Sequence, residues 1–244
     1  MNSPHVLVFQ HIAAEHPGSL RDCMLEDGVH WTAVELDEGE PIPPLDAFDA
    51  LLVMGGPMDV WQEHEHPWLA AEKAAIRRWV TELRRPYLGL CLGHQLLADA
   101  LGGSVGLAAE PEIGIMPVDL TEAGRAHPVL MDIDDPSMTL QWHGAEVKTL
   151  PHGATVLATS PACAVNAMAV GECAFGFQYH VELTEVTIDE WAAIPEYAHA
   201  LAHSAGPDAL DTMRAKAKRH MPGFLAASRT LYRNFMRLGF GGDP

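Results

Sequence analysis

The sequence predicts an α/β fold in three layers: a mainly parallel central sheet, helices on both of its faces, and a helical C-terminal extension. Three observations lead to this prediction. Short apolar stretches alternate with helical patterns over residues 5–103, which is typical of a parallel sheet built from βαβ units. Beyond Gly103 the segments become shorter and are separated by glycine and proline. From about Thr184 the apolar spacing becomes helical again.

The first elements form a βαβ unit. Residues 5–10 (HVLVFQ) and 31–36 (WTAVEL) have the apolar content of strands, and residues 19–28 (SLRDCMLEDG) between them have a helical pattern. The proline-rich segment 40–48 (EPIPPLDAF) predicts a loop. Residues 50–56 (ALLVMGG) then predict a short buried strand that ends in glycines.

A second alternation follows. Residues 68–85 predict a helix, because their apolar side chains lie near one helical face: Leu69, Ile76, Val80 and Leu83. After Pro86, residues 87–90 (YLGL) predict another buried strand. The chain then passes through Cys91 directly into a helical pattern, so this cysteine is expected at the carboxyl edge of the sheet.

The second half of the chain divides into predicted strands and predicted helices. The strands are expected at residues 113–121, 138–147, 154–160, 163–170 and 174–180. The helices are expected at residues 187–204, 208–221 and 224–238, with breaks at Pro195, Gly206-Pro207 and Pro222-Gly223. We therefore expect one α/β domain over residues 1–183, with a helical extension over residues 184–244 that packs on the same domain.

Composition excludes two classes of partner. The 244 residues include 33 acidic and 15 basic side chains, and the net charge of −18 repels nucleic acid. No apolar run approaches the roughly 18 residues of a membrane span, so we expect no membrane partner. The N-terminal residues lack the basic lead of a signal peptide, and the four cysteines form no Cys-x-x-Cys pair. These observations favour a cytoplasmic protein.

The position of Cys91 favours a reactive thiol. Gly89 and Gly93 flank it, and small neighbours permit the tight, strained turn of a nucleophile elbow. The N-terminus of the following helix adds positive potential and free N–H groups, which favour a thiolate over a thiol and can hold an oxyanion. The alternative is a small buried residue without chemistry, which is the role expected of the other three cysteines.

A thiolate nucleophile needs a base, and the segment 175–183 (FGFQYHVEL) provides a histidine at the end of an apolar run. Residues two apart in a strand point to the same side, so His180 and Glu182 are expected to lie together. With His180 facing Cys91 and Glu182 orienting the imidazole, the three residues would form a nucleophile, base and orienting acid.

These motifs resemble a known family. Residues 89–95 (GLCLGHQ) are similar to the Gly-x-Cys-x-Gly-x-Gln signature of class I glutamine amidotransferases, and His180 and Glu182 match that family's pair. The resemblance extends from about residue 51 to 182 and includes the motifs VMGGP (53–57), LGG (101–103), EIG (112–114) and WHG (142–144). The chain is most similar to the stand-alone, GMP-synthase-like amidotransferases and γ-glutamyl peptidases. It departs from their pattern at Val181, where many relatives have proline, and at Ala145, where GMP synthase relatives have Asp.

This resemblance implies a flavodoxin-like class I glutaminase fold, with residues 1–183 as the catalytic domain, and it implies a reaction. The Cys91 thiolate attacks the γ-amide carbon of L-glutamine, ammonia leaves, and water hydrolyses the γ-glutamyl thioester while His180 moves the protons. No cofactor and no metal are implied. Ammonia would pass to a separate synthetase, because the chain has no ATP-binding motif and no length for a synthetase domain.

The resemblance also implies which residues meet the substrate. The backbone N–H groups of Gly56 and Leu92 correspond to the oxyanion hole of the family. Gln95 corresponds to the residue that contacts the bound glutamine, and Trp142 and His143 are its expected neighbours. The alternative for Gln95 is an exposed helix residue without a role.

Three other functions compete with the glutaminase. A γ-glutamyl peptidase would use the same triad on a larger γ-glutamyl amide, and the residues near Cys91 do not separate the two. A cysteine hydrolase of the dienelactone type needs its acid before the histidine, whereas here His180 precedes Glu182. A non-catalytic binding or scaffold protein would have little physical reason to keep these three residues.

Two further histidine patterns bear on the site. His64, Glu65 and His66 are able to ligate a metal if their segment is extended, although a polar surface loop is the simpler interpretation. His94 lies inside the cysteine motif, and we expect it on the helix surface without a role.

Overall fold

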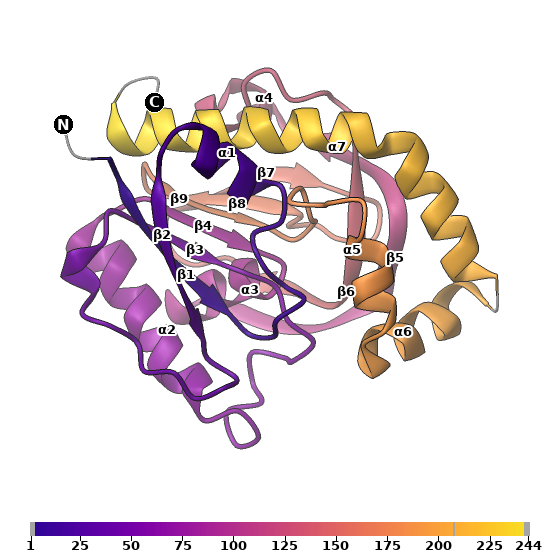
Figure 1. Cartoon of the computed structure of the whole chain (residues 1–244), viewed down its shortest axis with the longest axis horizontal. Coiled ribbons are helices and arrows are strands. Elements are labelled where there is room, and N and C mark those ends of the chain that lie inside the picture. The colour runs from indigo at the N-terminus through magenta and orange to yellow at the C-terminus, as the bar shows by residue number, and fades with distance from the viewer. Residues whose placement is uncertain (1–2, 207, 242–244) are drawn as a thin grey trace.

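The computed structural model describes residues 3–206 and 208–241, and it has the α/β fold that the sequence predicts (Figure 1). Within these ranges nine strands form the sheet: β1 (His5–Gln10), β2 (His30–Glu35), β3 (Ala50–Val53), β4 (Tyr87–Leu90), β5 (Ser104–Leu120), β6 (Ser137–Thr149), β7 (Ala154–Thr159), β8 (Ala167–Val170) and β9 (Ala174–Phe177). The α-helices are α1 (Leu20–Glu26), α2 (Trp68–Arg78), α3 (Leu92–Ala100), α4 (Glu122–Ala126), α5 (Thr187–Ala192), α6 (Pro195–Ala205) and α7 (Ala209–Phe240). Short helical turns occur at η1 (Leu45–Ala47), η2 (Trp79–Leu83) and η3 (Pro128–Leu130).

The sheet is mixed, with the strand order β2-β1-β3-β4-β9-β8-β7-β5-β6. Strands β2, β1, β3, β4 and β9 are parallel to one another. Strands β8, β7, β5 and β6 continue the sheet in antiparallel pairs. The carboxyl ends of the five parallel strands therefore meet at one edge, and this is the edge where ligands bind in open α/β sheets.

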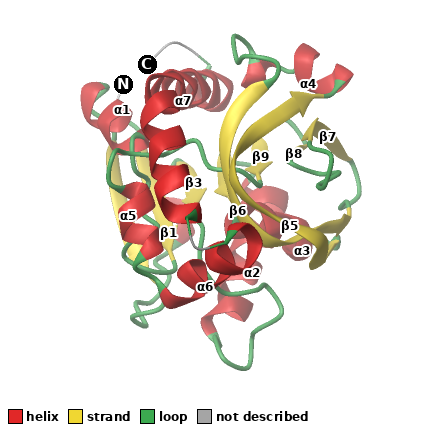
Figure 2. Ribbon diagram, turned by 90° about the vertical axis from the view of Figure 1, so that its right-hand side faces the viewer, coloured by secondary structure: helices red, strands yellow, loops and turns green. Residues whose placement is uncertain are grey.

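The side chains of β1 alternate between the two faces of the sheet. Val6 and Val8 belong to one hydrophobic cluster with residues of α1 and α7, whereas Leu7 and Phe9 belong to another with residues of α2 and α3. The strand period of two thus divides the apolar residues between two cores. Helices cover both faces of the sheet, which gives the expected three layers (Figure 1 and Figure 2).

Strands β5 and β6 form a long hairpin that curves strongly at one end of the sheet (Figure 2). Its register shifts between Leu107 and Glu112, as at a β-bulge. Ile113 and Leu140 of this hairpin pack with residues of α5, α6 and α7 in a third hydrophobic cluster. The C-terminal helices therefore share their core with the hairpin. The division of the chain at residue 183 stays a prediction.

The predicted break at Pro222-Gly223 is wrong. Helix α7 continues through both residues, and it bends in its N-terminal half (Figure 1). A proline inside a helix removes a hydrogen bond and costs about 3 kcal/mol. Met221 and Phe224, on either side, are nevertheless buried in the third cluster. Packing of this apolar face therefore maintains the helix across the proline.

The other expected boundaries of the C-terminal helices lie where the sequence places them. Pro195 is the first residue of α6, a position where its missing N–H and fixed φ are tolerated. Gly206 follows the last residue of the same helix, whereas Pro207 lies outside the described residues. Among the helices described, none combines the length and the apolar character needed to cross a membrane.

Helix α3 begins in close contact with β3. The N–H of Gly93 donates to the carbonyl oxygen of Met54 at 3.1 Å. A Cβ atom at Gly93 would lie 2.1 Å from the carbonyl oxygen of Val53, well inside van der Waals contact. The helix can therefore approach the strand this closely only with glycine at this position.

We expect Gly93→Ala to lower the free energy of unfolding by about 1–3 kcal/mol or more, because the new methyl group meets rigid backbone. Gly223→Ala is the matched control. A Cβ at Gly223 meets no atom within 4 Å, so this change inside α7 should raise stability by about 0.5–1 kcal/mol. Urea denaturation of both variants measures the difference. Equal stabilities for the two variants would contradict the close contact.

Candidate active site

The parallel strands β4 and β9 bring together three residues that are far apart in the sequence. Cys91 directly follows β4, and His180 and Glu182 follow β9. The two strands are adjacent and pair Leu90 with Phe177, so both leave the sheet at the same edge. Nδ1 of His180 lies 2.7 Å from Oε1 of Glu182. All three side chains are almost fully buried.

Cys91 has a backbone conformation that is rare for a residue with a side chain, with φ at 48° and ψ at −102°. Its N–H donates to the carbonyl oxygen of Phe177 at 2.8 Å, which ties the turn to β9. A Cβ at Gly89 would lie 2.5 Å from the backbone of Gly93, so both flanking glycines are needed for space. The turn therefore has the strained, closely packed geometry of a nucleophile elbow.

The imidazole of His180 favours its protonated form. Burial lowers its pKa, but the charge of Glu182 and hydrogen bonds with Cys91 and Glu182 outweigh burial and hold the pKa well above its ordinary value. Because Nδ1 is bound to Glu182, Nε2 is the ring nitrogen left for the thiol of Cys91. Trp191 packs edge to face against the imidazole, with ring centroids 4.4 Å apart, and further restricts its orientation.

Glu182 is fixed through its backbone as well as its side chain. Oε2 accepts a hydrogen bond from the N–H of Val181 at 2.8 Å. Its carbonyl oxygen accepts from the N–H of Ser19 at 2.8 Å, in the loop after β1. Gly18 has φ at +49°, and a Cβ there would lie 1.7 Å from this carbonyl. The loop approaches Glu182 this closely because residue 18 has no side chain.

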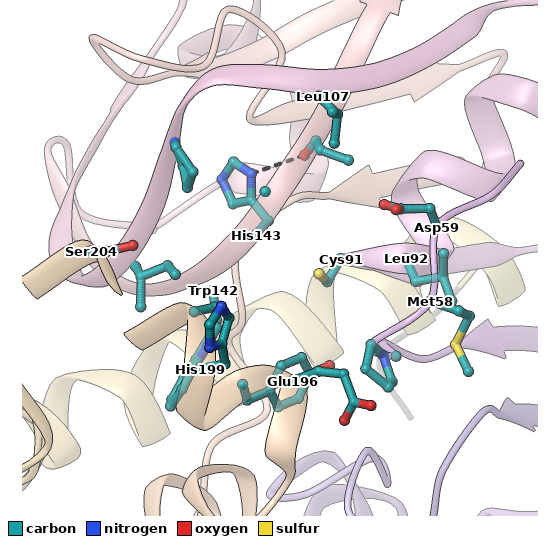
Figure 3. Close-up of a pocket in the computed structure, with 18 of the residues that line it drawn as sticks. Met58, Asp59, Cys91, Leu92, Leu107, Trp142, His143, Glu196, His199 and Ser204 are labelled. Atoms are coloured by element: carbon teal, nitrogen blue, oxygen red, sulfur yellow. Dashed lines mark hydrogen bonds between the residues drawn. The ribbon is translucent and has the colours of Figure 1, made fainter. Parts of the chain in front are cut away.

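A cavity of about 360 Å³ opens beside Cys91 (Figure 3). In that view Met58 and Asp59 lie on one side of Cys91, whereas His199 and Ser204 of α6 lie on the other. The volume falls in the range of small-molecule sites. The C-terminal extension therefore provides one wall of the cavity, which no spacing in the sequence indicated.

The two expected oxyanion-hole residues both line this cavity. Among the described residues, neither the N–H of Gly56 nor the N–H of Leu92 has a hydrogen-bond acceptor. Leu92 is the first residue of α3, where the helix leaves its N–H groups without intrahelical partners. Two donors next to Cys91 are thus available to a ligand.

The three expected substrate-binding residues also line the cavity, and each is held by protein contacts. Nε2 of Gln95 donates to the carbonyl oxygen of Ala145 and to Oε1 of Gln178, at 3.1 Å each. Nδ1 of His143 donates to the same carbonyl at 3.0 Å (Figure 3). Trp142 is buried, and its ring packs on aromatic residues of the C-terminal helices. Gln95 is therefore not an exposed helix residue.

Gln178 is a neighbour of the thiol that the sequence analysis missed. Its Nε2 lies 3.6 Å from Sγ of Cys91, within hydrogen-bond distance for sulfur. The side chain is fully buried. Gln178 lies two residues before His180, so the alternation expected from the sequence for this segment also pointed to this residue.

Glu15 is a second missed residue, a carboxylate buried behind the imidazole. The hydroxyl of Tyr197, on α6, donates to Oε1 of Glu15. Burial raises the pKa of Glu15, and the nearby Glu182 adds to the increase, whereas His180 and Tyr197 oppose it. Ligand atoms of Glu15, His180 and Glu182 all lie within 4.8 Å of one another. No local motif marks Glu15, because its partners come from distant segments.

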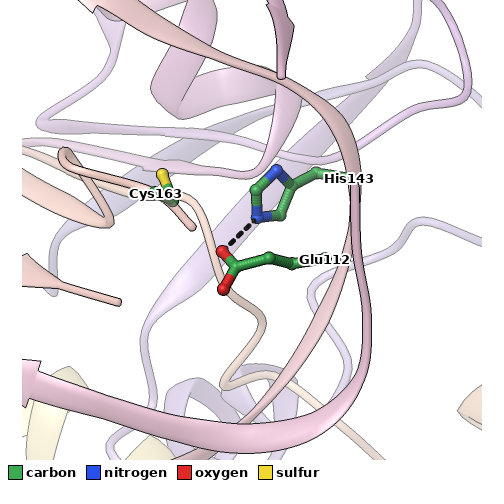
Figure 4. A group of neighbouring side chains, drawn as sticks. All are labelled: Glu112, His143 and Cys163. Atoms are coloured by element: carbon green, nitrogen blue, oxygen red, sulfur yellow. Dashed lines mark hydrogen bonds and ion pairs between the residues drawn. The ribbon is translucent and has the colours of Figure 1, made fainter. Parts of the chain in front are cut away.

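Glu112, His143 and Cys163 form a second compact group (Figure 4), and His143 also lines the cavity. Nε2 of His143 lies 3.2 Å from Oε2 of Glu112, and Ser160 and Asn166 also donate to this carboxylate. Burial raises the pKa of Glu112, but these hydrogen bonds outweigh burial and lower it. Burial raises the pKa of Cys163 to about 12, so its thiol stays protonated. The group is a hydrogen-bonded network, and we assign it no metal.

His64 and His66 lie in a segment without strand geometry. The segment around His64 and His66 forms turns, so no strand alternation points these two side chains in one direction. Both are at least partly exposed, as expected of a surface loop.

The expectation that His94 lies on the helix surface is wrong. It is fully buried, and a Cβ at Gly176 would lie 2.6 Å from its Nδ1, because α3 packs directly on β9.

Comparison with known proteins agrees with this geometry. Residues 18–190 match the family model "Glutamine amidotransferase class-I". The glutamine amidotransferase-like protein YfeJ of Salmonella typhimurium is 38% identical over 165 residues, which covers 66% of this chain and 67% of that protein. A subunit of the glutamine-hydrolysing GMP synthase of Saccharolobus solfataricus is 33% identical, covering 59% of this chain and 72% of that protein. Gamma-glutamyl peptidase 3 of Arabidopsis thaliana is 25% identical, covering 68% of each.

The fold has a close counterpart among solved structures. A glutamine amidotransferase from Thermotoga maritima superposes with a TM-score of 0.86 and 26% sequence identity, covering 98% of this chain and all of that one. The expected fold and family are therefore confirmed. The chain belongs to the class I glutamine amidotransferase family.

Proposed function

We propose that this protein hydrolyses the γ-amide of L-glutamine through a γ-glutamyl thioester on Cys91. The observation that carries the proposal is the strained turn at Cys91 beside the buried His180–Glu182 pair. A protein that only binds a ligand gains nothing from a strained backbone and a buried ion pair at the same point. Nucleophilic catalysis uses a nucleophile presented on a tight turn and a base oriented by a third group, which is the arrangement of Cys91, His180 and Glu182.

The electrostatics of the site support each step. The raised pKa of His180 favours an imidazolium, which stabilises a thiolate at Cys91 and can then donate a proton to the leaving ammonia. Attack on the amide creates an oxyanion, and the free N–H groups of Gly56 and Leu92 are available to hold it. One such donor contributes roughly 3–4 kcal/mol to transition-state stabilisation. Water then hydrolyses the thioester with His180 as base.

Ammonia released at Cys91 would serve an acceptor enzyme on a separate chain. The relative from Saccharolobus solfataricus is named as part of a glutamine-hydrolysing synthase. All four cysteines are free thiols, which fits the reducing conditions of the cytoplasm. We therefore place the protein there, with glutamine as substrate and a synthetase as partner.

A γ-glutamyl peptidase is the second candidate, and the wall of the cavity formed by α6 favours it. Glu196, His199, His203 and Ser204 extend the lining beyond the residues around Cys91. A glutaminase does not need such polar groups to bind its leaving group, which is ammonia. A larger leaving group that carries its own charges is able to bind them. One of the relatives is named as a γ-glutamyl peptidase.

Replacement of Cys91 by Ser should abolish turnover, by on the order of 10⁴-fold or more, since a hydroxyl is a far weaker nucleophile at this site. Intact mass after incubation with an electrophilic glutamine analogue should show one adduct in the wild type and none in Cys91→Ser. Cys173→Ser is the matched control, because Cys173 precedes β9 at the opposite edge of the sheet. Labelling that persists in Cys91→Ser would exclude the mechanism.

Glu182→Gln should lower kcat by about 10²–10⁴-fold with a smaller change in KM, because the acid orients the imidazole and stabilises its charge. Glu182 raises the pKa of His180, so the wild-type imidazolium persists to higher pH. The neutral amide removes this effect, and the alkaline limb of kcat/KM should move to lower pH. The exposed Glu185 provides the control variant, Glu185→Gln. An unshifted alkaline limb would show that Glu182 does not govern His180.

The two candidate substrates are separated by their specificity constants. We expect kcat/KM for glutamine to exceed the value for γ-glutamyl dipeptides, since the proposed leaving group is ammonia. Ammonia release reports the hydrolysis of glutamine, and release of the second amino acid of the dipeptide reports the peptidase reaction. Both are measured on the same preparation. A larger kcat/KM for the dipeptides would assign the protein as a γ-glutamyl peptidase acting through the same thioester.

A further inference from the structure

The peptide bond between Gly55 and Gly56 decides where one of the two free N–H groups points. In a trans peptide the carbonyl and the following N–H point in opposite directions. The direction of the Gly55 carbonyl therefore sets the direction of the Gly56 N–H. Because Gly56 lines the cavity beside Cys91, any rotation of this peptide would replace a donor by an acceptor there.

Little in the backbone itself prevents such a rotation. The chain is fixed up to Met54, whose N–H donates to Phe9 at 3.0 Å and whose carbonyl accepts from Gly93 at 3.1 Å. The next two residues are both glycines, and rotation of a peptide between glycines meets the least steric resistance. Neither position has room for a side chain. A Cβ at Gly55 would lie 2.4 Å from the side chain of Glu15, and a Cβ at Gly56 would lie 2.6 Å from the side chain of Met58.

A buried histidine holds this peptide from behind. Nδ1 of His11 lies 2.8 Å from the carbonyl oxygen of Gly55, and among the described residues no other hydrogen bond reaches that oxygen. A carbonyl oxygen can only accept, so Nδ1 carries the hydrogen. The ring is fully buried and stacks on Trp68, with centroids 5.4 Å apart. The donor is thus fixed in position and direction.

Glu72 fixes the protonation of this histidine. Its Oε1 lies 2.9 Å from Nε2 of His11, and the carboxylate is also fully buried. Burial lowers the pKa of His11, but the charge of Glu72 and its hydrogen bond, together with the Gly55 carbonyl and Glu15, outweigh burial and raise it. Both ring nitrogens also face oxygen acceptors, the Gly55 carbonyl and the Glu72 carboxylate, and this geometry favours an imidazolium that donates to each of them.

Stability does not explain this pair. Burying two charges costs several kcal/mol per ion, and their mutual attraction repays this only when every remaining polar atom is satisfied. Oε2 of Glu72 is buried without a hydrogen-bond partner among the described residues. Replacement of a buried ion pair by apolar residues of similar volume is often neutral or stabilising. The ion pair is therefore better explained by what His11 does to the Gly55–Gly56 peptide.

We propose that His11, oriented by Glu72, is a positioning residue that holds the Gly55–Gly56 peptide with its N–H directed at the oxyanion formed on attack by Cys91. This inference rests on the proposed function, because it assumes an acyl transfer at Cys91. The positive ring also polarises the peptide it binds, which strengthens the N–H as a donor. The reaction thus depends on a residue that never touches the substrate.

His11→Leu tests the proposal, since leucine has a similar volume and no donor. We expect kcat for γ-glutamyl hydrolysis to fall by about 10²–10³-fold, the effect of losing one oxyanion-hole donor. Alkylation of Cys91 by iodoacetamide forms no oxyanion, and its rate should remain unchanged. His11→Asn keeps an N–H donor near the place of Nδ1 and should recover part of the activity. If His11→Leu lost both hydrolysis and alkylation, the proposal would be overturned. Wild-type rates of both reactions in the variant would also overturn it.

Crystal structures of the wild type and His11→Leu provide a readout that does not depend on activity. We expect the Gly55 carbonyl to keep its direction toward residue 11 in the wild type and to rotate or become heterogeneous in the variant. An unchanged carbonyl in the variant would overturn the inference. If the wild type hydrolyses no γ-glutamyl amide, the proposed function fails, while the two structures still decide the orientation of the peptide.

Glu72→Gln replaces His11→Leu if the latter does not fold. The amide keeps the shape of the side chain but removes the charge that holds His11 protonated. A smaller loss of hydrolysis than expected for His11→Leu, with unchanged alkylation of Cys91, would support the proposal. Wild-type hydrolysis in Glu72→Gln would contradict it.

Discussion

The parallel pairing of β4 with β9 is the contact on which the candidate site depends. It brings Cys91 and His180 to the same edge of the sheet, although the two residues are 89 residues apart in the sequence. The hydrogen bond from the Cys91 N–H to Phe177 extends this pairing into the strained turn itself. The small glycines around the cysteine then let α3 begin at once, so its N-terminus faces the cavity. This sheet contact brings the thiol, the base and the helix N-terminus to one edge, and a hydrogen bond from the His180 N–H to the carbonyl oxygen of Leu140 at 2.9 Å fixes the base further.

Buried charge is the second constraint. Behind His180 lie the carboxylates of Glu182 and Glu15, and farther back lies the His11–Glu72 pair. Each of these titratable groups is buried with an opposite charge or a hydrogen bond facing it, which offsets part of the cost of burial. The same partners fix the orientation of the two imidazoles. The same contacts thus offset the cost of the buried charges and fix the positions of the two imidazoles. A substitution in one of these contacts is therefore expected to affect both the packing of this region and the proposed chemistry.

The C-terminal helices belong to this arrangement. Tyr197 reaches Glu15, and Trp191 packs against the imidazole of His180. Because α7 continues across Pro222, it forms one long element that packs on the sheet and on the curved hairpin. Sequence rules for proline describe the isolated helix, and they fail here because tertiary packing supplies more free energy than the missing hydrogen bond costs.

The sequence by itself determined the α/β class, the position of Cys91 at the end of a strand, and the pairing of His180 with Glu182. These are local properties, since strand period, turn chemistry and the glycine requirement are set by neighbouring residues. Only the tertiary structure decided that Glu15 and His11 lie behind the site and that α6 forms a wall of its cavity. Their partners come from distant segments of the chain, and no spacing in one sequence records which distant side chains share a buried charge.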